Sequence, residues 1–217
     1  MNKCIITLPA LAILFFFSFS GQAQEDSGNE LQTIFKKNPV RSSGGYGAIS
    51  NKFTTINGHY ANLVEIYGGW YVNHKFLLGL SASALTNNIP VPASFSAIPG
   101  DQLSYMYGDF GLRTEYAIAS NKAFHLVFTL NTGAGFTVQY DRYFHDERSV
   151  GVQYFPMDEN WFFVAEPGIQ LEMNIFRWMR FSPGYSYRMT YGSDALQLKD
   201  SDISGHSLNL TMKFGKF

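Results

Sequence analysis

Cysteine and charge are both scarce in this 217-residue chain. The single cysteine, Cys4, lies near the N-terminus, so no intramolecular disulfide can form. This excludes the small secreted domains that disulfides hold together. Charged residues make up only 15% of the chain and the formal net charge is -1, so there is no basic footprint for nucleic acid. The sequence therefore predicts no nucleic-acid partner, and it indicates no acidic or basic one.

An apolar stretch near the N-terminus has the features of a targeting segment. Lys3 precedes the apolar residues 5–19, and Gly21 and Ala23 are small residues at cleavage positions. We therefore predict a secretory signal peptide over residues 1–23, removed after Ala23. The stretch is shorter than the roughly 20 residues that a membrane-spanning helix needs. Cys4 precedes it, which argues against a lipid-attachment cysteine and leaves the mature chain without thiol chemistry.

The rest of the chain divides into a short tail and one domain. Residues 24–43 are polar, with a turn signal at Asn38-Pro39, and are predicted to form an N-terminal tail. Residues 44–217 show no internal charge block or low-complexity run, which favours a single domain. Aromatic residues are abundant, at 17% of the chain.

Alternation of apolar and polar residues dominates this domain. From Phe124 to Asp141 apolar side chains alternate with small or polar ones, which predicts an amphipathic strand longer than most strands of globular proteins. Similar patterns predict eight strands. We place them at about 44–53, 60–73, 75–87, 103–118, 123–141, 161–176, 179–191 and 206–217. The first is the least distinct, because its glycines blur the two faces.

Connections of alternating length favour a transmembrane barrel. Short links are expected at 73–74, 119–122 and 176–178, and long ones at 87–102, 142–160 and 192–205, after a modest first loop at 54–59. Eight antiparallel strands with short turns at one end and long loops at the other are typical of an up-and-down transmembrane β-barrel with periplasmic short turns. The predicted strands satisfy the length of roughly 9 to 11 residues that a tilted membrane strand needs.

Aromatic residues gather at both predicted interfaces, where amphipathic rings are stable. The expected short-turn belt contains Trp70, Tyr71, Phe76, Tyr116, Phe124, Phe176, Trp178 and Phe214. The expected long-loop belt contains Tyr140, Trp161, Phe163 and Tyr191. A soluble lipid-binding barrel such as a lipocalin is the structural rival. Its water-facing side would be rich in Lys and Glu, whereas the polar face here is mostly Gly, Ser, Asn and Thr, which suit a narrow lumen.

The signal sequence, the eight alternating strands, the long loops at one end and the final phenylalanine resemble the small bacterial outer-membrane β-barrel family. The likeness covers about residues 45–217 and extends to outer membrane proteins A, X and W and to small barrels of Bacteroidetes type. It implies an outer-membrane location, contact with outer-membrane lipid and periplasmic N- and C-termini. In that family the barrel-assembly machinery recognises the last strand, which implies this role for Phe214 and Phe217.

The two phenylalanines have opposite parity along the strand. Two explanations are open. Gly215 allows a bulge that turns the Phe217 ring back towards lipid, or Phe214 is the membrane-interface ring and Phe217 hangs below it as a signal.

The polar face predicts a charged lumen with five acids and four bases. These residues are Glu65, Asp109, Arg113, Glu115, Glu166, Glu172, Arg180, Arg188 and Lys213. We expect Glu166 and Glu172 to pair with Arg180 and Arg188 on the neighbouring strand, because buried charges persist when paired. Such a network would plug an eight-stranded barrel. The alternative is a gated polar path, which requires the network to rearrange.

Candidate catalytic residues are few. His59, His145 and the pair His206-Ser207 carry no recognisable lipase or acyltransferase motif, so we interpret all three histidines as solvated loop residues. His125 is expected to point inwards and hydrogen-bond. The run 145–147, His-Asp-Glu, is too contiguous to converge on a metal, and no helix follows the glycine-rich stretches to form a phosphate loop. We therefore predict no catalytic residue, no cofactor and no metal.

Two functional hypotheses remain from different classes. One is a non-enzymatic outer-membrane protein whose loops serve surface interaction or envelope integrity. The other is a porin-like narrow channel or a binding barrel for a small hydrophobic or polar solute. A lipid A-modifying barrel enzyme is the least favoured reading. The proline-containing loop 87–102 favours surface recognition or a lid, and the sequence identifies no extracellular ligand or protein.

Overall fold

The computed structural model describes residues 43–73, 75–98, 102–141, 157–194 and 198–217. The predicted signal peptide, residues 24–42 of the predicted tail, and His145 with its neighbours Asp146 and Glu147 lie outside the described residues. No helix within the described ranges has both the length and the hydropathy needed to cross a membrane.

Nine strands make up almost all of the regular structure in the described ranges. They are β1 (Ser43–Ile56), β2 (His59–Val72), β3 (Phe76–Leu85), β4 (Ile89–Pro90), β5 (Leu103–Ile118), β6 (Phe124–Asp141), β7 (Met157–Phe176), β8 (Met179–Tyr191) and β9 (Gly205–Gly215). One short helix, α1 (Asp200–Ile203), and a 3₁₀ turn (Ala93–Phe95) interrupt two of the connections.

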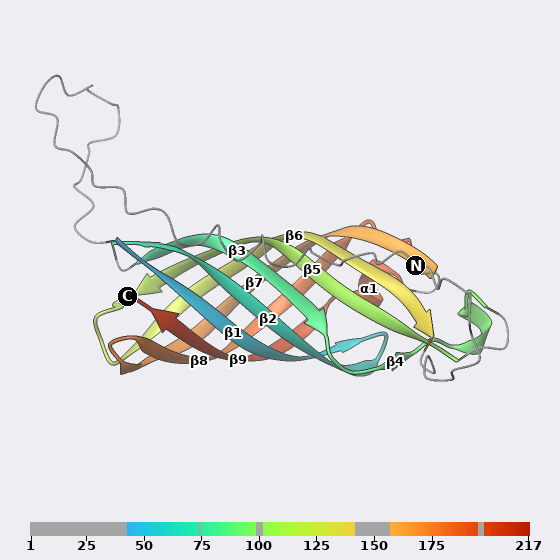
Figure 1. Cartoon of the computed structure of the whole chain (residues 1–217), viewed down its shortest axis with the longest axis horizontal. Coiled ribbons are helices and arrows are strands. Elements are labelled where there is room, and N and C mark those ends of the chain that lie inside the picture. Colours follow the sequence, from blue (N-terminus) through green and yellow to red (C-terminus); the bar gives the residue numbers. More distant parts are fainter. Residues whose placement is uncertain (1–42, 74, 99–101, 142–156, 195–197) are drawn as a thin grey trace, which may run out of the picture. The chain divides into compact units, whose positions relative to one another are not determined.

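The eight long strands form a closed antiparallel barrel, as predicted. Each pairs with its neighbour along the chain, β1 pairs with β9 to close the ring, and β3 pairs with β5. The two-residue strand β4 adds to the edge of β5. Closure satisfies the backbone hydrogen bonds of every long strand, which is the condition for strands in contact with lipid. Figure 1 shows the strands running obliquely around the barrel.

Several predicted boundaries are corrected. The first connection is a two-residue turn, because β1 continues to Ile56 and only Asn57 and Gly58 separate it from β2. Both turn residues have positive φ, 51° and 72°, as the favoured hairpin turns require. Strand β7 begins at Met157, earlier than expected, and β9 ends at Gly215.

The two ends of the barrel differ in their connections. The start of β1, the end of β9 and the short turns β2–β3, β5–β6 and β7–β8 share one end, here called the short-turn end. The other end, the long-loop end, carries the turn Asn57-Gly58 together with β4 and α1. Figure 1 shows the C-terminus at the first of these ends and β4 and α1 towards the second.

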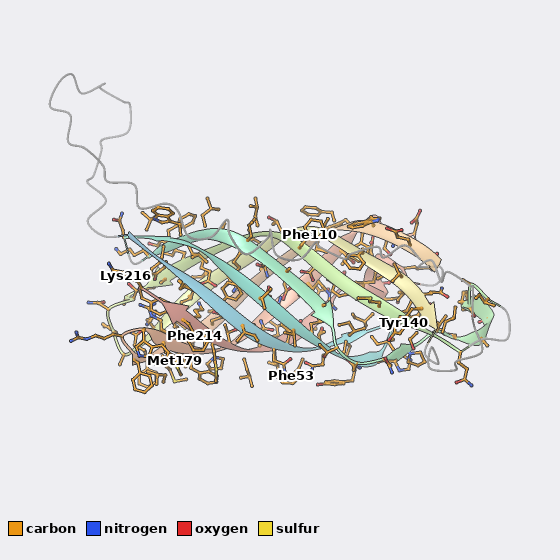
Figure 2. The ribbon with its side chains drawn as sticks, viewed as in Figure 1. Phe53, Phe110, Tyr140, Met179, Phe214 and Lys216 are labelled. Atoms are coloured by element: carbon orange, nitrogen blue, oxygen red, sulfur yellow. The ribbon has the colours of Figure 1, made fainter. Side chains whose placement is uncertain are left out.

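The two faces of the strands are separated as the alternation predicts. In β6 the outward side chains of Phe124, Leu126 and Phe128 are 62%, 42% and 47% exposed, whereas the intervening His125 and Val127 are buried. Large exposed apolar side chains occur in the same way on the other long strands, as Figure 2 illustrates for Phe110 and Phe214. Tyr71 is an exception to the expected belt, because its ring is buried inside the barrel.

Candidate functional site: the charged barrel interior

Polar and charged side chains fill the middle of the barrel. Each of the nine predicted lumen residues lies on the inner face and is at most 7% exposed. They come from β2, β5, β7, β8 and β9, because alternation directs every second residue of each strand inwards. Buried charges in such a medium need partners close by.

Lys52 of β1 is a lumen cation that the sequence reasoning missed. Its side chain is 2% exposed, and its Nζ lies 3.0 Å from Glu65 Oε1 and 3.0 Å from Glu166 Oε2. With Lys52 included, five carboxylates face five Lys or Arg side chains. Alternation could have identified Lys52, because Ser50, Lys52 and Thr54 share one face of β1 and all three are buried. The glycines earlier in β1 obscure this alternation.

A second cluster of ion pairs connects four strands nearer the short-turn end. Lys213 Nζ lies 2.7 Å from Glu115 Oε2 and 2.7 Å from Glu172 Oε2. Arg113 donates to Glu115 over 2.8 Å, and Arg180 donates to Glu172 over 2.5 Å. Lys213 thereby bridges two carboxylates whose strands are not neighbours, which sequence pairing rules do not reveal.

His125 adds a hydrogen-bonding ring to the second cluster. Its Nε2 lies 2.8 Å from Glu172 Oε1, and its Nδ1 lies 3.2 Å from the carbonyl oxygen of Lys122. The inward, hydrogen-bonding position matches the expectation for this residue.

The expected pairing of β7 carboxylates with β8 arginines forms only in part. Glu172 pairs with Arg180, but Glu166 contacts Lys52 and accepts a hydrogen bond from Ser186 over 2.6 Å. Among the described residues Arg188 forms no ion pair; it donates to the carbonyl oxygens of Ile203, over 2.9 Å, and Thr55, over 3.3 Å. Arg188 lies next to α1, where the carbonyl oxygen of Ile203, the last residue of that helix, accepts its hydrogen bond.

Tyr107 contacts both Asp109 and Arg188, the two lumen charges for which the described residues provide no ion pair. Its hydroxyl donates to Asp109 Oδ2 over 2.7 Å, and Ser83 donates to the same oxygen over 2.5 Å. The guanidinium carbon of Arg188 lies 4.9 Å from the centroid of the Tyr107 ring. A cation over a ring and a carboxylate at its hydroxyl give both charges a partner without direct contact.

An apolar cluster closes the interior at the long-loop end, and we call it the long-loop cap. Leu103, Tyr105 and Tyr107 of β5 and Phe162 and Val164 of β7 point inwards here. The connections between the long strands complete it with Ile89, Val91, Leu198 and Ile203. Because α1 buries Ile203 and β4 buries Ile89, these two connections fold over the barrel mouth. The sequence left a lid open as one reading of loop 87–102, and Ile89 and Val91 of that loop do pack in the cap. The sequence reasoning did not foresee the part that Leu198 and Ile203 take in it.

A second cluster, the short-turn cap, closes the other end. It contains Tyr46, Tyr67, Tyr71 and Leu77, with Phe217 packed against them. The Phe217 ring lies 5.0 Å from Tyr46 and 6.5 Å from Tyr71, centroid to centroid. The Phe217 ring therefore neither turns back outwards through a bulge nor hangs below Phe214; it turns into the barrel. Phe214 points outwards and is 39% exposed, as the second explanation expected.

The interior between the two caps is closely packed around Asp109. A cavity of about 10 Å³ lies among Ser81, Asp109 and Asn131, which is room for about one water molecule. This packing and the paired charges favour a filled barrel over an open passage.

Comparison with solved structures supports the same architecture. No protein-family model and no curated protein matches the chain. Neisserial surface protein A superposes with a TM-score of 0.52 at 9% identity, over 81% of this chain and 97% of that one. The chain has the fold of a small outer-membrane β-barrel.

Two further outer-membrane barrel structures are similar to a lesser degree. The attachment invasion locus protein of Yersinia pestis gives a TM-score of 0.45 at 11% identity, over 80% of this chain and 97% of that one. The outer membrane protein OprG of Pseudomonas aeruginosa gives 0.38 at 15% identity, over 79% and 93%.

In this outer-membrane barrel fold His206 lies on a strand and not in a loop. It is near the start of β9, where its ring stacks on Tyr185, at 5.8 Å, and contacts Tyr187, at 4.8 Å. The Tyr185 hydroxyl and His206 Nδ1 are hydrogen-bonded. The solvated-loop interpretation of His206 is therefore wrong. His59 is exposed at the first position of β2.

A groove on the outside of the barrel contains these rings. It has a volume of about 570 Å³ and is lined by Tyr60, Tyr185, Tyr187 and His206 among others. Ser207 is 1% exposed and belongs to the inner face, so its hydroxyl and the His206 ring lie on opposite sides of β9. Adjacent strand residues therefore do not form a nucleophile–base pair here. Among the described residues no three His, Cys, Asp or Glu side chains are grouped to hold a metal.

Proposed function

We propose that this protein is an integral outer-membrane β-barrel that catalyses no reaction and whose long-loop end serves surface interaction or envelope integrity. The observation that carries the proposal is the contrast between the faces: large apolar side chains outside and a neutralised, capped charge network inside. Its outer surface would contact outer-membrane lipid, its short turns and termini would lie in the periplasm, and the barrel-assembly machinery would insert it.

The filled polar interior argues against a soluble lipid-binding barrel. Such a barrel holds its ligand in an apolar cavity and shows a polar surface to water. Here the polarity is reversed: Leu80, on the outside, is 68% exposed, whereas Lys213, inside, is fully buried. Exposing this apolar surface to water would be costly, at about 25 cal/mol per Å². A lipid environment removes that cost.

The loop containing the 3₁₀ turn supports a role in recognition. The Gln139 side chain holds it from β6, donating to the carbonyl oxygen of Phe95 over 3.0 Å and accepting from the Ala97 amide over 3.0 Å. Pro92, Ala93 and Ser94 remain exposed. A loop fixed in this way presents a preformed surface, which binds with a smaller entropic cost than a free loop.

Fractionation tests the membrane location. We expect the protein in the outer-membrane fraction, with electrophoretic migration that changes on boiling, because a closed barrel resists unfolding in detergent. Recovery in a soluble fraction with migration unaffected by boiling would overturn the proposal.

Conductance tests the closed interior. In planar bilayers we expect the purified protein to show no steady open channel, because two caps and a paired network fill the barrel. A steady open state would favour the channel or solute-binding alternative instead.

A further inference from the structure

The charged side chains in the described turns of the short-turn end have one sign. Within its described turns every charged side chain is basic: Lys75, Lys122, Arg177 and Lys216. All four are exposed, and none forms an ion pair with another described residue. The described connections at the long-loop end, by contrast, are mainly acidic, with Asp194, Asp200 and Asp202 against Lys199. Among the described connections, the side-chain charge at the two ends is therefore of opposite sign.

Two of these cations flank a row of aromatic rings, which we call the ring row. Phe176 and Trp178 are stacked, with centroids 5.6 Å apart and planes within 8°. Trp178 stacks in turn on Phe214, at 6.1 Å and 24°. The three rings are 57%, 57% and 39% exposed on the outside of the barrel.

The backbone brings the cations to this row. Arg177 lies between Phe176 and Trp178 in the β7–β8 turn. The Gly215 amide donates a hydrogen bond to the carbonyl oxygen of Trp178 over 2.9 Å. This bond holds Lys216, the next residue, close to the ring row. Figure 2 shows Phe214 and Lys216 at the same end of the barrel. Two exposed basic side chains thus lie next to a platform of stacked aromatic rings.

This combination matches the chemistry of a charged lipid. Aromatic rings are stable at the depth of glycerol and the upper acyl chains, while Lys and Arg reach the phosphates. We propose that the ring row with Arg177 and Lys216 binds an anionic phospholipid of the periplasmic leaflet. The proposal rests on the proposed membrane location of the barrel. The acyl chains lie on the rings, and the two cations bind the phosphate.

Lipid-dependent quenching of Trp178 tests this site. The protein has three tryptophans, so Trp70→Phe/Trp161→Phe leaves Trp178 as the only one. The full mature chain is reconstituted into vesicles that contain a fixed fraction of brominated phosphatidylglycerol or of phosphatidylcholine with the same brominated chains. We expect stronger quenching by the phosphatidylglycerol, corresponding to roughly fivefold local enrichment per basic residue at low salt. The difference should shrink at high salt.

Charge variants in the same background provide the comparison. Arg177→Gln/Lys216→Gln should abolish the preference for phosphatidylglycerol. Lys75→Gln/Lys199→Gln removes the same charge away from the ring row and should retain it.

The outcomes separate the two proposals. Equal quenching by the two lipids, or a preference that survives Arg177→Gln/Lys216→Gln, would overturn the phospholipid site while leaving the membrane barrel intact. Quenching by neither lipid would contradict the membrane location itself.

Discussion

The guanidinium carbon of Arg180 lies 3.9 Å from the centroid of the Phe217 ring. Arg180 also pairs with Glu172, so the ring covers one end of the ion-pair network. A cation between a carboxylate and an aromatic face is stabilised by both. Phe217 is thus part of the barrel interior, while Phe214 remains on the outer face.

The two C-terminal phenylalanines should therefore respond differently to substitution. We expect Phe217→Ala to lower the free energy of unfolding by about 2 kcal/mol, through loss of the cation–π contact and ring packing, while the protein still reaches the outer membrane. Phe214→Ala should instead reduce the amount assembled in cells. Denaturant unfolding in detergent and quantitative fractionation measure the two effects. Normal assembly of Phe214→Ala together with failure of Phe217→Ala would reverse the assignment.

Removing Lys52 should be strongly destabilising. Lys52→Met leaves the carboxylates of Glu65 and Glu166 without their shared cation, and we expect a loss of about 3 to 5 kcal/mol in unfolding experiments. Adding Glu166→Gln should restore part of the loss, because it removes one uncompensated charge. Lys199→Met, an exposed control, should change stability by less than about 0.5 kcal/mol. If Lys52→Met left the free energy of unfolding nearly unchanged, the network would tolerate the loss of one positive charge.

Close strand approach should make Gly111 intolerant of a side chain. A Cβ at Gly111 would lie 2.2 Å from the carbonyl oxygen of Thr132, which the β5–β6 pairing holds in place. We expect Gly111→Ala to reduce the folded fraction, measured as the heat-modifiable band. Gly47→Ala is the control, since its Cβ would meet nothing closer than 3.9 Å. Equal folding of both variants would mean that the strands can separate without penalty.

The histidine on β9 should have no catalytic effect. With Ser207 on the other face of the strand, we expect lipid A mass spectra to be unchanged on overexpression of either the wild type or His206→Ala. A lipid A modification that appears with the wild type and disappears with His206→Ala would establish an enzyme after all.

Strand parity explains how much of the fold was predictable. Alternation in β6, β7 and β8 separates two faces, because neighbouring residues of a strand point to opposite sides. The small polar residues of one face then identify it as the inner one. The same local rule places Glu172 and Lys213 inside. In β1 the rule was harder to apply, because Gly44, Gly45 and Gly47 carry no side chain to mark a face. Lys52 was missed for that reason.

Local reasoning predicted the pair Glu172–Arg180 but not the other contacts of the buried charges. Lys213 bridges Glu115 and Glu172 from different strands, and Arg188 turns to the carbonyl of Ile203 instead of Glu166. Long side chains reach several partners across a narrow lumen, so their choice depends on barrel closure and stagger and on where the loops fold.

Alternation and connection lengths are thus sufficient for the eight-stranded barrel, because both are local properties of the chain. The inward turn of Phe217 and the two caps emerge only from the closed structure, because the space they fill exists only after closure.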